Sequence, residues 1–247
     1  MKQLVFDHKD KIYEADLESG VDLSIPFGHE ESFSAWGSPD MQAEPVRYGD
    51  WIGSVEAGAA VNFFDLRLNP HGNGTHTEWA GHILKERGSV TDQIRGEWFM
   101  AFLVEGRPDA EGCISEPDLL AGYEQLPPAV ILRTSAAYQR PADRNFTGTA
   151  PPFLSPSFVH GLRKKGVDHL LIDLPSVDPE EDEGRLEAHR AFWFSGEEEL
   201  RPHATITEFI QVPAELEQGL YLLHLQLAPL INDASPSRPI LYPVKER

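Results

Sequence analysis

Short apolar runs, several of them alternating with polar positions, recur along the whole chain and predict strands. The alternation is clearest in residues 12–17 (IYEADL) and 61–68 (VNFFDLRL). Compact apolar runs predict six more strands, at residues 97–106, 129–134, 169–175, 204–212, 219–228 and 238–244. We therefore expect a sheet built from segments that are far apart in the sequence.

Three segments carry helix signals. Residues 115–126 begin with a capping-box pattern, in which Ser115 is followed by Asp118 three residues later. Residues 155–166 have a proline near the start, basic residues near the end and a closing glycine. Residues 187–196 are the third candidate. Because strands outnumber helices in mixed order, we expect one α/β domain around a mixed sheet, with a long loop over residues 139–156.

Composition and charge exclude several classes of protein. The 247 residues are 40% apolar, and the formal net charge of −19 argues against nucleic acid and anionic membrane surfaces as partners. We expect the acidic runs at residues 178–187 and 196–199 to be solvated. The single cysteine, Cys113, excludes a disulfide framework and a multi-cysteine zinc site. The N-terminal residues lack the apolar core of a secretory signal and no run has membrane-spanning length, so we expect a cytoplasmic protein.

The segment HGNGTHTEWAGH, residues 71–82, gathers three of the ten histidines beside one acid. On an extended chain His76 and Glu78 lie two residues apart and project from the same face. An imidazole and a carboxylate that converge in this way can bind zinc, manganese or a similar divalent ion. The alternative is that these histidines are surface residues or hydrogen-bonded core residues, and this segment alone does not decide between the two.

Two residues in other segments are candidates for the same site. His189 lies on a predicted helix, and Glu208 lies in a predicted strand among β-branched and aromatic neighbours. An unpaired carboxylate would be costly to bury there. Glu208 is therefore either exposed on an edge or compensated by a cation, and a metal ion would supply that cation.

The same twelve residues resemble the signature of the putative cyclase family, which includes bacterial kynurenine formamidases and isatin hydrolases. The family pattern is His-x-Gly-Thr-His-x-Asp-x-Pro-x-His. In this chain Gly74, Thr75, His76 and His82 fit it in register, whereas Glu78 stands at the aspartate position. Residues 22–27, 131–134, 172–179 and 232–241 are similar to further family segments, and the resemblance covers nearly the whole chain.

The resemblance implies a swivelling β/β/α fold, a single domain over residues 1–247 with an N-terminal arm, and a homodimer or homotetramer. It also implies one or two divalent ions, zinc or manganese. The implied substrate is a small molecule, with an aromatic compound as one option. Carried over by position, the metal ligands are His71, His76, Glu78, His189 and Glu208. His82 would be the general acid/base, assisted by Glu208.

Two departures from the family pattern bear on this assignment. The first family histidine lies four residues before the second, but His71 lies five before His76, which places it on the opposite face of a regular strand. A one-residue β-bulge at residues 72–74 (GNG) would restore the register, so we expect His71 to bind through such a bulge. The other departure is Glu78, whose extra methylene pushes the carboxylate outward. Trp79 and Ala80 also change the pocket wall, which leaves the substrate open.

Three functions remain in view. The leading hypothesis is hydrolysis of an amide, formamide or lactam bond by a metal-bound hydroxide, with His82 moving the proton. The alternatives are a binding protein with a degraded metal site and a metal-dependent lyase or dehydratase. Phe33 and Trp36 either line an aromatic pocket or pack in the core or an interface. The remaining histidines have no ligand-like spacing and are expected to be structural: His8, His29, His160, His169, His203 and His224.

Overall fold

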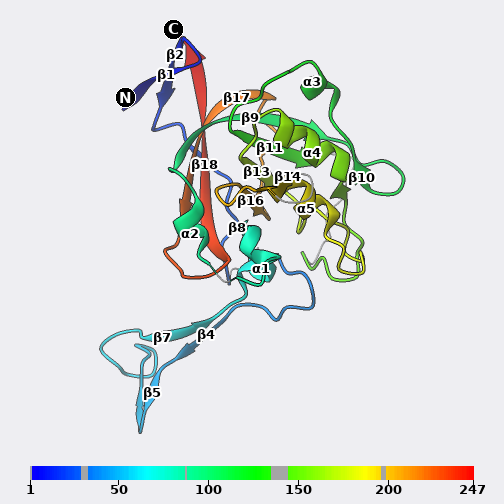
Figure 1. The fold of residues 1–247 in the computed structure, drawn as a ribbon. Coiled ribbons are helices and arrows are strands. Elements are labelled where there is room, and N and C mark those ends of the chain that lie inside the picture. The colour runs from blue at the N-terminus through cyan, green and yellow to red at the C-terminus, as the bar shows by residue number, and fades with distance from the viewer. Residues whose placement is uncertain (1, 29–32, 87, 135–143, 196–198) are drawn as a thin grey trace.

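A closed mixed sheet forms the body of the protein (Figure 1). The computed structural model describes residues 2–28, 33–86, 88–134, 144–195 and 199–247. In sheet order, the strands are β1 (Gln3–His8), β2 (Lys11–Asp16), β18 (Ala234–Glu246), β17 (Gly219–Leu227), β9 (Trp98–Gly106), β11 (Ala129–Thr134), β13 (His169–Ile172), β16 (Thr205–Glu208) and β8 (His76–Trp79). Strand β8 also pairs with β18, which closes the sheet into a barrel-like ring, and β3 (Val21–Asp22) pairs with β18.

The central strands are parallel and buried on both faces. Strands β9, β11, β13 and β16 pair with one another in parallel, in this order. The pairs on either side of this group, which involve β17, β18 and β8, are antiparallel. In β11, Val130 and Leu132 pack in one apolar cluster, while Ala129 and Ile131 pack in the other. Burial on both faces explains why these strands are nearly continuous apolar runs. Each buried valine, leucine or isoleucine side chain contributes roughly 1.5–3 kcal/mol.

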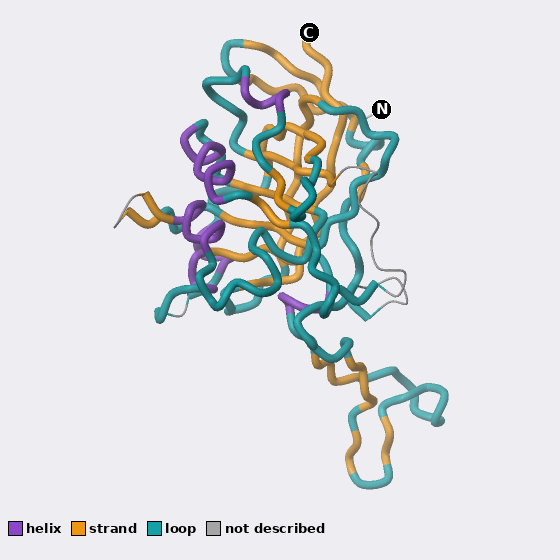
Figure 2. Tube along the Cα trace, turned by 90° about the vertical axis from the view of Figure 1, so that its right-hand side faces the viewer, coloured by secondary structure: helices purple, strands orange, loops and turns teal. Residues whose placement is uncertain are grey.

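Helices cover one face of this sheet (Figures 1 and 2). The Ser155 hydroxyl accepts a hydrogen bond from the backbone N–H of Phe158 and caps α4 (Pro156–Lys164), as the sequence predicts. Helix α5 (Glu187–Trp193) packs beside it, and both bury apolar side chains against the sheet. The helix predicted over residues 115–126 is wrong for most of its length. Only α3 (Asp118–Ala121) forms, because Pro117 at its N-cap offers no side-chain acceptor and no capping box assembles at Ser115.

An arm formed by residues 42–67 extends away from the body (Figures 1 and 2). It contains β4 (Gln42–Pro45) paired with β7 (Phe64–Arg67), and β5 (Arg47–Tyr48) paired with β6 (Trp51–Ile52). The strand predicted over residues 61–68 is therefore part of the arm rather than of the main sheet. Several apolar side chains of the arm are exposed, including Tyr48 at 68% and Leu66 at 60%. A two-stranded ribbon has no interior in which to bury them.

The remaining elements are short. They are α1 (Pro70–Asn73), the 3₁₀ turn η1 (Ala80–His82), α2 (Val90–Gln93), and the pairs β10 (Cys113–Ile114) with β12 (Phe153–Leu154) and β14 (Phe194–Ser195) with β15 (Glu199–Leu200). Of the loop predicted over residues 139–156, positions 139–143 lie outside the described residues, 144–152 form no helix or strand, and the last residues enter β12 and α4. None of the described helices has the length and apolar character needed to cross a membrane.

Candidate metal centre

Strand β8 positions two of the candidate ligands between two other strands. It pairs with β16 on one side and β18 on the other, and all four of its residues are buried. His76 and Glu78 share a face, as the two-residue spacing predicts. The register places Glu208 of β16 directly opposite His76, where its Oε2 lies 3.4 Å from Nε2 of His76. Closure of the sheet therefore brings Glu208 to the histidine segment.

His71 reaches the same site by a different path from the one that the sequence suggested. The expected β-bulge at residues 72–74 is wrong, because the chain forms the helical turn α1 there. Pro70 starts the turn, and the Asn69 side chain caps it by accepting the backbone N–H of His71 at 3.1 Å. The turn carries the imidazole to Glu78, with Nδ1 of His71 3.1 Å from Oε2 of the carboxylate.

Gly72 and Gly74 lie where the backbone of this turn comes too close to other parts of the chain for a side chain to fit. A Cβ added to Gly72 would lie 2.6 Å from the Cβ of Ser38, and one added to Gly74 would lie 3.0 Å from the carbonyl oxygen of Ile25. The turn therefore packs against Ile25 and Ser38 with no room for a side chain at either glycine. This contact fixes where His71 enters the site.

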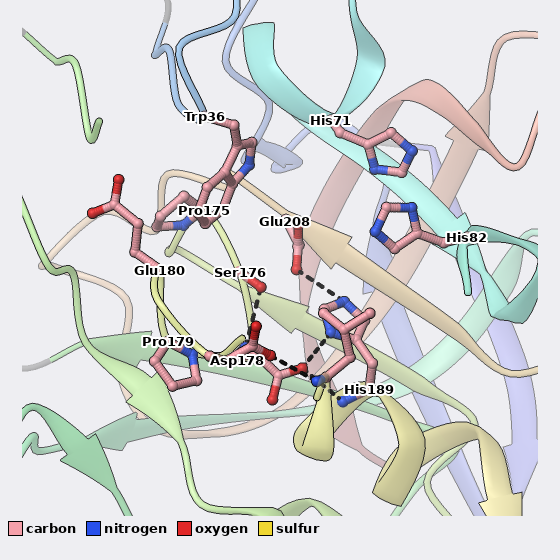
Figure 3. Close-up of a pocket in the computed structure, with 12 residues that line it drawn as sticks. Trp36, His71, His82, Pro175, Ser176, Asp178, Pro179, Glu180, His189 and Glu208 are labelled. Atoms are coloured by element: carbon pink, nitrogen blue, oxygen red, sulfur yellow. Dashed lines mark hydrogen bonds and ion pairs between the residues drawn. The ribbon is translucent and has the colours of Figure 1, made fainter. Parts of the chain in front are cut away.

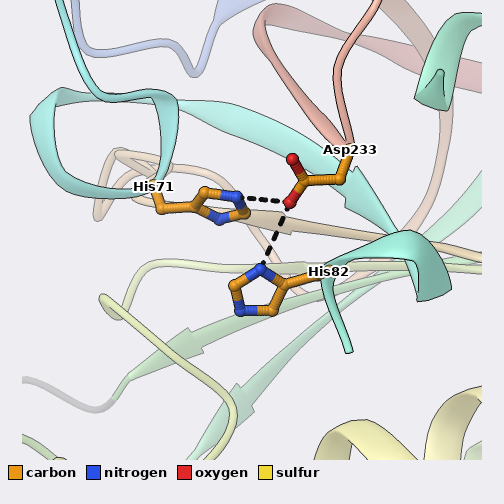
Figure 4. Close-up of side chains that lie close together, drawn as sticks. All are labelled: His71, His82 and Asp233. Atoms are coloured by element: carbon orange, nitrogen blue, oxygen red, sulfur yellow. Dashed lines mark hydrogen bonds and ion pairs between the residues drawn. The ribbon is translucent and has the colours of Figure 1, made fainter. Parts of the chain in front are cut away.

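His82 and Asp233 lie beside His71 (Figure 4), and both side chains are partly exposed. His82 ends η1, and its side chain is 32% exposed. Its Nδ1 lies 3.3 Å from Oδ2 of Asp233 and 3.7 Å from Oε2 of Glu78. The ring centroids of His71 and His82 are 4.2 Å apart.

His189 comes from the buried face of α5 (Figure 3). Its Nε2 donates to Oε1 of Glu78 at 3.1 Å and lies 3.9 Å from Oε1 of Glu208. On the other side of the ring, Nδ1 contacts Oδ2 of Asp178 at 2.5 Å. Asp178 also accepts the backbone N–H groups of Ala188 and His189, and so caps the start of α5. One carboxylate thus orients both the helix and the imidazole that it carries.

The histidines and carboxylates strongly shift one another's pKa values. Burial alone would raise the pKa of Glu78, but the charge of His82, the hydrogen bond from His189 and the close contact with His71 hold it well below its usual value. Burial alone would lower the pKa of His189, but hydrogen bonds to Asp178 and Glu78 raise it to about 10. The pKa of His71 is likewise raised to about 10 by Asp233 and Glu78. Without a metal ion, protons on His71 and His189 therefore balance the buried carboxylates.

The donor set fits a divalent metal ion. His71, His76 and Glu78 offer ligand atoms within 4.8 Å of one another, and so do Glu78, His82 and His189. Nδ1 of His76 donates to the carbonyl oxygen of Gly74 at 3.0 Å, which leaves Nε2 as the nitrogen that a metal ion could bind. Within the described residues, this buried Nε2 and Oε2 of Glu78 make no hydrogen bond of good geometry. Imidazole nitrogen with carboxylate oxygen is a set that zinc and manganese accept.

The structure brings the six sequence-predicted site residues into one region. Glu208 lies beside the two ligand groups rather than inside them, and its Oε1 accepts the backbone N–H of Val177 at 3.2 Å. The sequence interpretation missed Asp178 and Asp233. Asp178 was included in an acidic run expected to be solvated, but it is buried. Both residues fall in segments that resemble the family, which was the one available signal for them.

A cavity of about 240 Å³ opens onto the cluster (Figure 3). His71, His82, His189 and Glu208 line it on one side, and its apolar wall includes Trp36, Pro175 and Pro179. Phe33 does not line this cavity, because it is buried against Phe146 and Phe209. The two aromatic residues considered together in the sequence therefore have different surroundings.

The other described histidines lie outside the cluster. His169 is buried and bonded to the Thr205 hydroxyl, His203 pairs with Asp168, and His224 stacks on Trp98. His8 lies near Tyr13 in the first hairpin, and His160 lies on α4. His29 lies outside the described residues. The structural role expected for these histidines stays a prediction.

Comparison with known proteins places this chain in a family. Residues 21–179, more than half of the chain, match the putative cyclase family. The chain therefore belongs to this family, as the signature at residues 71–82 indicated. The mixed α/β fold with a closed sheet also agrees with that of family members of known structure.

Several solved structures share the fold. A protein from Bacillus stearothermophilus described as a predicted metal-dependent hydrolase is 15% identical, with a TM-score of 0.61 over 90% of this chain and 97% of its own. Isatin hydrolase A from Labrenzia aggregata, bound to benzyl benzoate, is 15% identical, with a TM-score of 0.64 over 90% of this chain and 93% of its own. An isatin hydrolase bound to the product analogue thioisatinate is 14% identical, with a TM-score of 0.62 over 92% of both chains.

Proposed function

We propose that this protein is a metal-dependent hydrolase that cleaves an amide, formamide or lactam bond. The observation that carries the proposal is the set of histidines around Glu78 at the base of a cavity. Membership of the putative cyclase family supports it, as do neighbours of the same fold that are described as metal-dependent hydrolases.

The residues that would hold the ion are His71, His76, Glu78 and His189, with Glu208 beside them. A divalent ion, when bound, supplies Lewis acidity that polarises a carbonyl group and lowers the pKa of water. The protein contributes ligands fixed by three different elements, α1, β8 and α5. The carboxylates Asp178 and Asp233 hold the outer nitrogens of His189 and His71.

His82 is the general acid/base of this proposal. It lines the cavity, is partly exposed and faces Asp233 through Nδ1, which leaves Nε2 to accept a proton and return it to the leaving nitrogen. Glu208 lines the same cavity and can assist.

The cavity favours a small substrate with a flat apolar group. Its volume is about 240 Å³, and Trp36, Pro175 and Pro179 offer flat apolar surface opposite the histidines. The fold that the chain shares with isatin hydrolases supports an aromatic lactam or formamide. The contact between His71 and Glu78 at 3.1 Å supports an intact site over a degraded one.

Self-association through the arm of residues 42–67 completes the proposal. The exposed apolar side chains of this arm have no core of their own, and Tyr48, Leu66 and Phe63 are each more than half exposed. A second copy of the chain is the partner that carries the same arm, and two-fold pairing of identical surfaces is the commonest arrangement among homo-oligomers.

The test of the hydrolase assignment combines metal analysis with turnover. We expect the purified protein to retain zinc or manganese after loading and to hydrolyse a member of a panel of aryl formamides and lactams. His82→Ala should keep the metal and lose turnover by roughly 10²–10⁴-fold. His160→Ala, a change at a partly buried position of α4, is the control and should change neither. A protein that takes up no metal after loading would refute the assignment, and products of elimination would indicate a lyase.

A further inference from the structure

One carboxylate oxygen of Asp233 lies between the rings of His71 and His82 (Figure 4). Oδ2 is 2.8 Å from Nε2 of His71 and 3.3 Å from Nδ1 of His82. An ionised carboxylate only accepts hydrogen bonds, so both ring nitrogens must carry the proton. The two imidazoles are thus held by one shared acceptor.

The backbone fixes this carboxylate against the ligand strand. The carbonyl oxygen of Asp233 accepts the backbone N–H of Trp79 at 3.2 Å, and the next residue, Ala234, starts β18 opposite Glu78. One residue earlier, the carbonyl oxygen of Asn232 accepts the backbone N–H of Val90 at 3.0 Å. Asp233 therefore has little freedom to move relative to β8, although its side chain is 27% exposed.

The shared acceptor determines which ring nitrogen of His71 is available to bind a metal ion and which ring nitrogen of His82 is available to transfer a proton. With Nε2–H of His71 directed to Asp233, Nδ1 faces Oε2 of Glu78 at 3.1 Å and is the atom available to a metal ion. With Nδ1–H of His82 directed to Asp233, Nε2 is the atom available to a substrate proton. We propose that Asp233 is a positioning residue that sets the tautomers of both the metal ligand His71 and the acid/base His82. This inference rests on the proposed function and adds a residue to it.

A comparison with Asp178 shows what is particular to Asp233. Asp178 bonds one ring, that of His189, and its other contacts go to the start of α5. Asp233 instead bonds two rings, those of the proposed metal ligand His71 and the proposed acid/base His82. A change at Asp233 therefore affects metal binding and proton transfer together, whereas a change at Asp178 acts through a single ligand and its helix.

Direct ligation by Asp233 is the competing role, because its carboxylate, His71 and His82 offer atoms within 4.8 Å of one another. The geometry favours positioning over ligation. Nε2 of His71 faces Asp233, whereas Nδ1, on the other side of the same ring, faces Glu78. Since one nitrogen cannot both donate to Asp233 and bind a metal ion, His71 binds through the nitrogen that points away from Asp233.

The experiment is ¹⁵N NMR of histidine side chains in the zinc-loaded protein, with zinc affinity and stoichiometry measured in parallel. Wild type should show His71 protonated at Nε2 and His82 at Nδ1. In Asp233→Ala the His82 signal should change to the Nε2–H form, with partial recovery in Asp233→Asn, which keeps an acceptor oxygen. Zinc stoichiometry should stay the same while affinity falls roughly 10–100-fold. Asp92→Ala removes an exposed charge on α2 and should change neither readout.

Each other outcome has a definite meaning. Loss of one zinc equivalent at saturating zinc in Asp233→Ala would make Asp233 a ligand and overturn the proposal. Unchanged His82 nitrogen signals in a folded Asp233→Ala protein would also overturn it. If wild type binds neither zinc nor manganese, the proposed function fails. The same comparison on metal-free wild type and Asp233→Ala at pH 9 then still decides whether Asp233 sets the His82 tautomer.

Discussion

Nε2 of His189 lies 3.1 Å from Oε1 of Glu78, although 111 residues separate the two in the chain. The other oxygen of Glu78 lies 3.1 Å from Nδ1 of His71. Glu78 thus spans the site from the helix α5 side to the helix α1 side. The family signature has the shorter aspartate at this position. The extra methylene of Glu78 lets its carboxylate contact both His71 and His189.

Shortening this side chain is expected to break one of the two contacts. In Glu78→Asp the carboxylate is withdrawn by one methylene and cannot reach both His71 and His189. Zinc affinity, measured by competition with a chelator, should fall on the order of tenfold or more, which corresponds to about 1.4 kcal/mol. Glu97→Asp, an exposed change of the same type, is the control. Undiminished affinity in Glu78→Asp would contradict the bridging role.

Metal binding at neutral pH is expected to release protons. The pKa values of His71 and His189 are raised to about 10, so both rings are protonated at pH 7 without metal, but a metal ion binds only a neutral imidazole. Apparent zinc affinity should therefore rise with pH between 7 and 10. Calorimetry in buffers of different ionisation enthalpy should give a release of about two protons per binding event. Heats that are independent of the buffer would rule this out.

Replacing Gly74 with alanine should destabilise the turn that delivers His71. The added Cβ would lie 3.0 Å from the carbonyl oxygen of Ile25 and 3.0 Å from the ring of Phe27. Overpacking of this kind costs about 1–3 kcal/mol, which a denaturant titration would detect. Gly122→Ala is the matched control, since its Cβ would meet nothing within 4 Å and its backbone is right-handed helical. If both variants were equally stable, the close approach would not explain this glycine.

His169 is expected to make the protein less stable in mild acid. Burial lowers its pKa from 6.5 to about 4, so the unfolded chain takes up a proton below pH 6.5 that the folded protein does not take up until about pH 4. The free energy of unfolding should therefore fall as pH drops from 6.5 to 4, by about 3 kcal/mol for this group. Urea titrations of metal-free protein across this window should show a shallower pH dependence in His169→Gln, with His160→Gln unchanged. Parallel curves for wild type and His169→Gln would refute this.

The arm should determine the oligomeric state. Tyr48→Asp combined with Leu66→Asp places two charges on its exposed apolar surface, and sedimentation should then show a smaller species than wild type. Leu119→Asp, which adds a charge on exposed α3, should leave the wild-type assembly intact. A monomeric wild-type protein would contradict self-association through the arm.

The sequence by itself determined the local features of the site. The two-residue period placed His76 and Glu78 on one face, and Ser155 and Pro156 marked the start of α4. The continuous apolar runs of β9, β11 and β13 predicted buried strands. The signature motif indicated the family, which the match over residues 21–179 confirmed. These features depend on residues that are close together in the chain, because spacing within one strand or helix sets the direction in which each side chain points.

Only the tertiary structure decided through which contacts the distant groups meet. The period of a strand tells which face a side chain takes but not which strand lies beside it. Pairing of β8 with both β16 and β18 was needed to place Glu208 opposite His76 and Asp233 beside His71. The sequence predicted that Asp178 lies in a solvated acidic run. The packing of α5 instead buries it against His189. The position of His71 also depends on packing, because the helical turn that carries it lies so close to Ser38 that a Cβ at Gly72 would not fit.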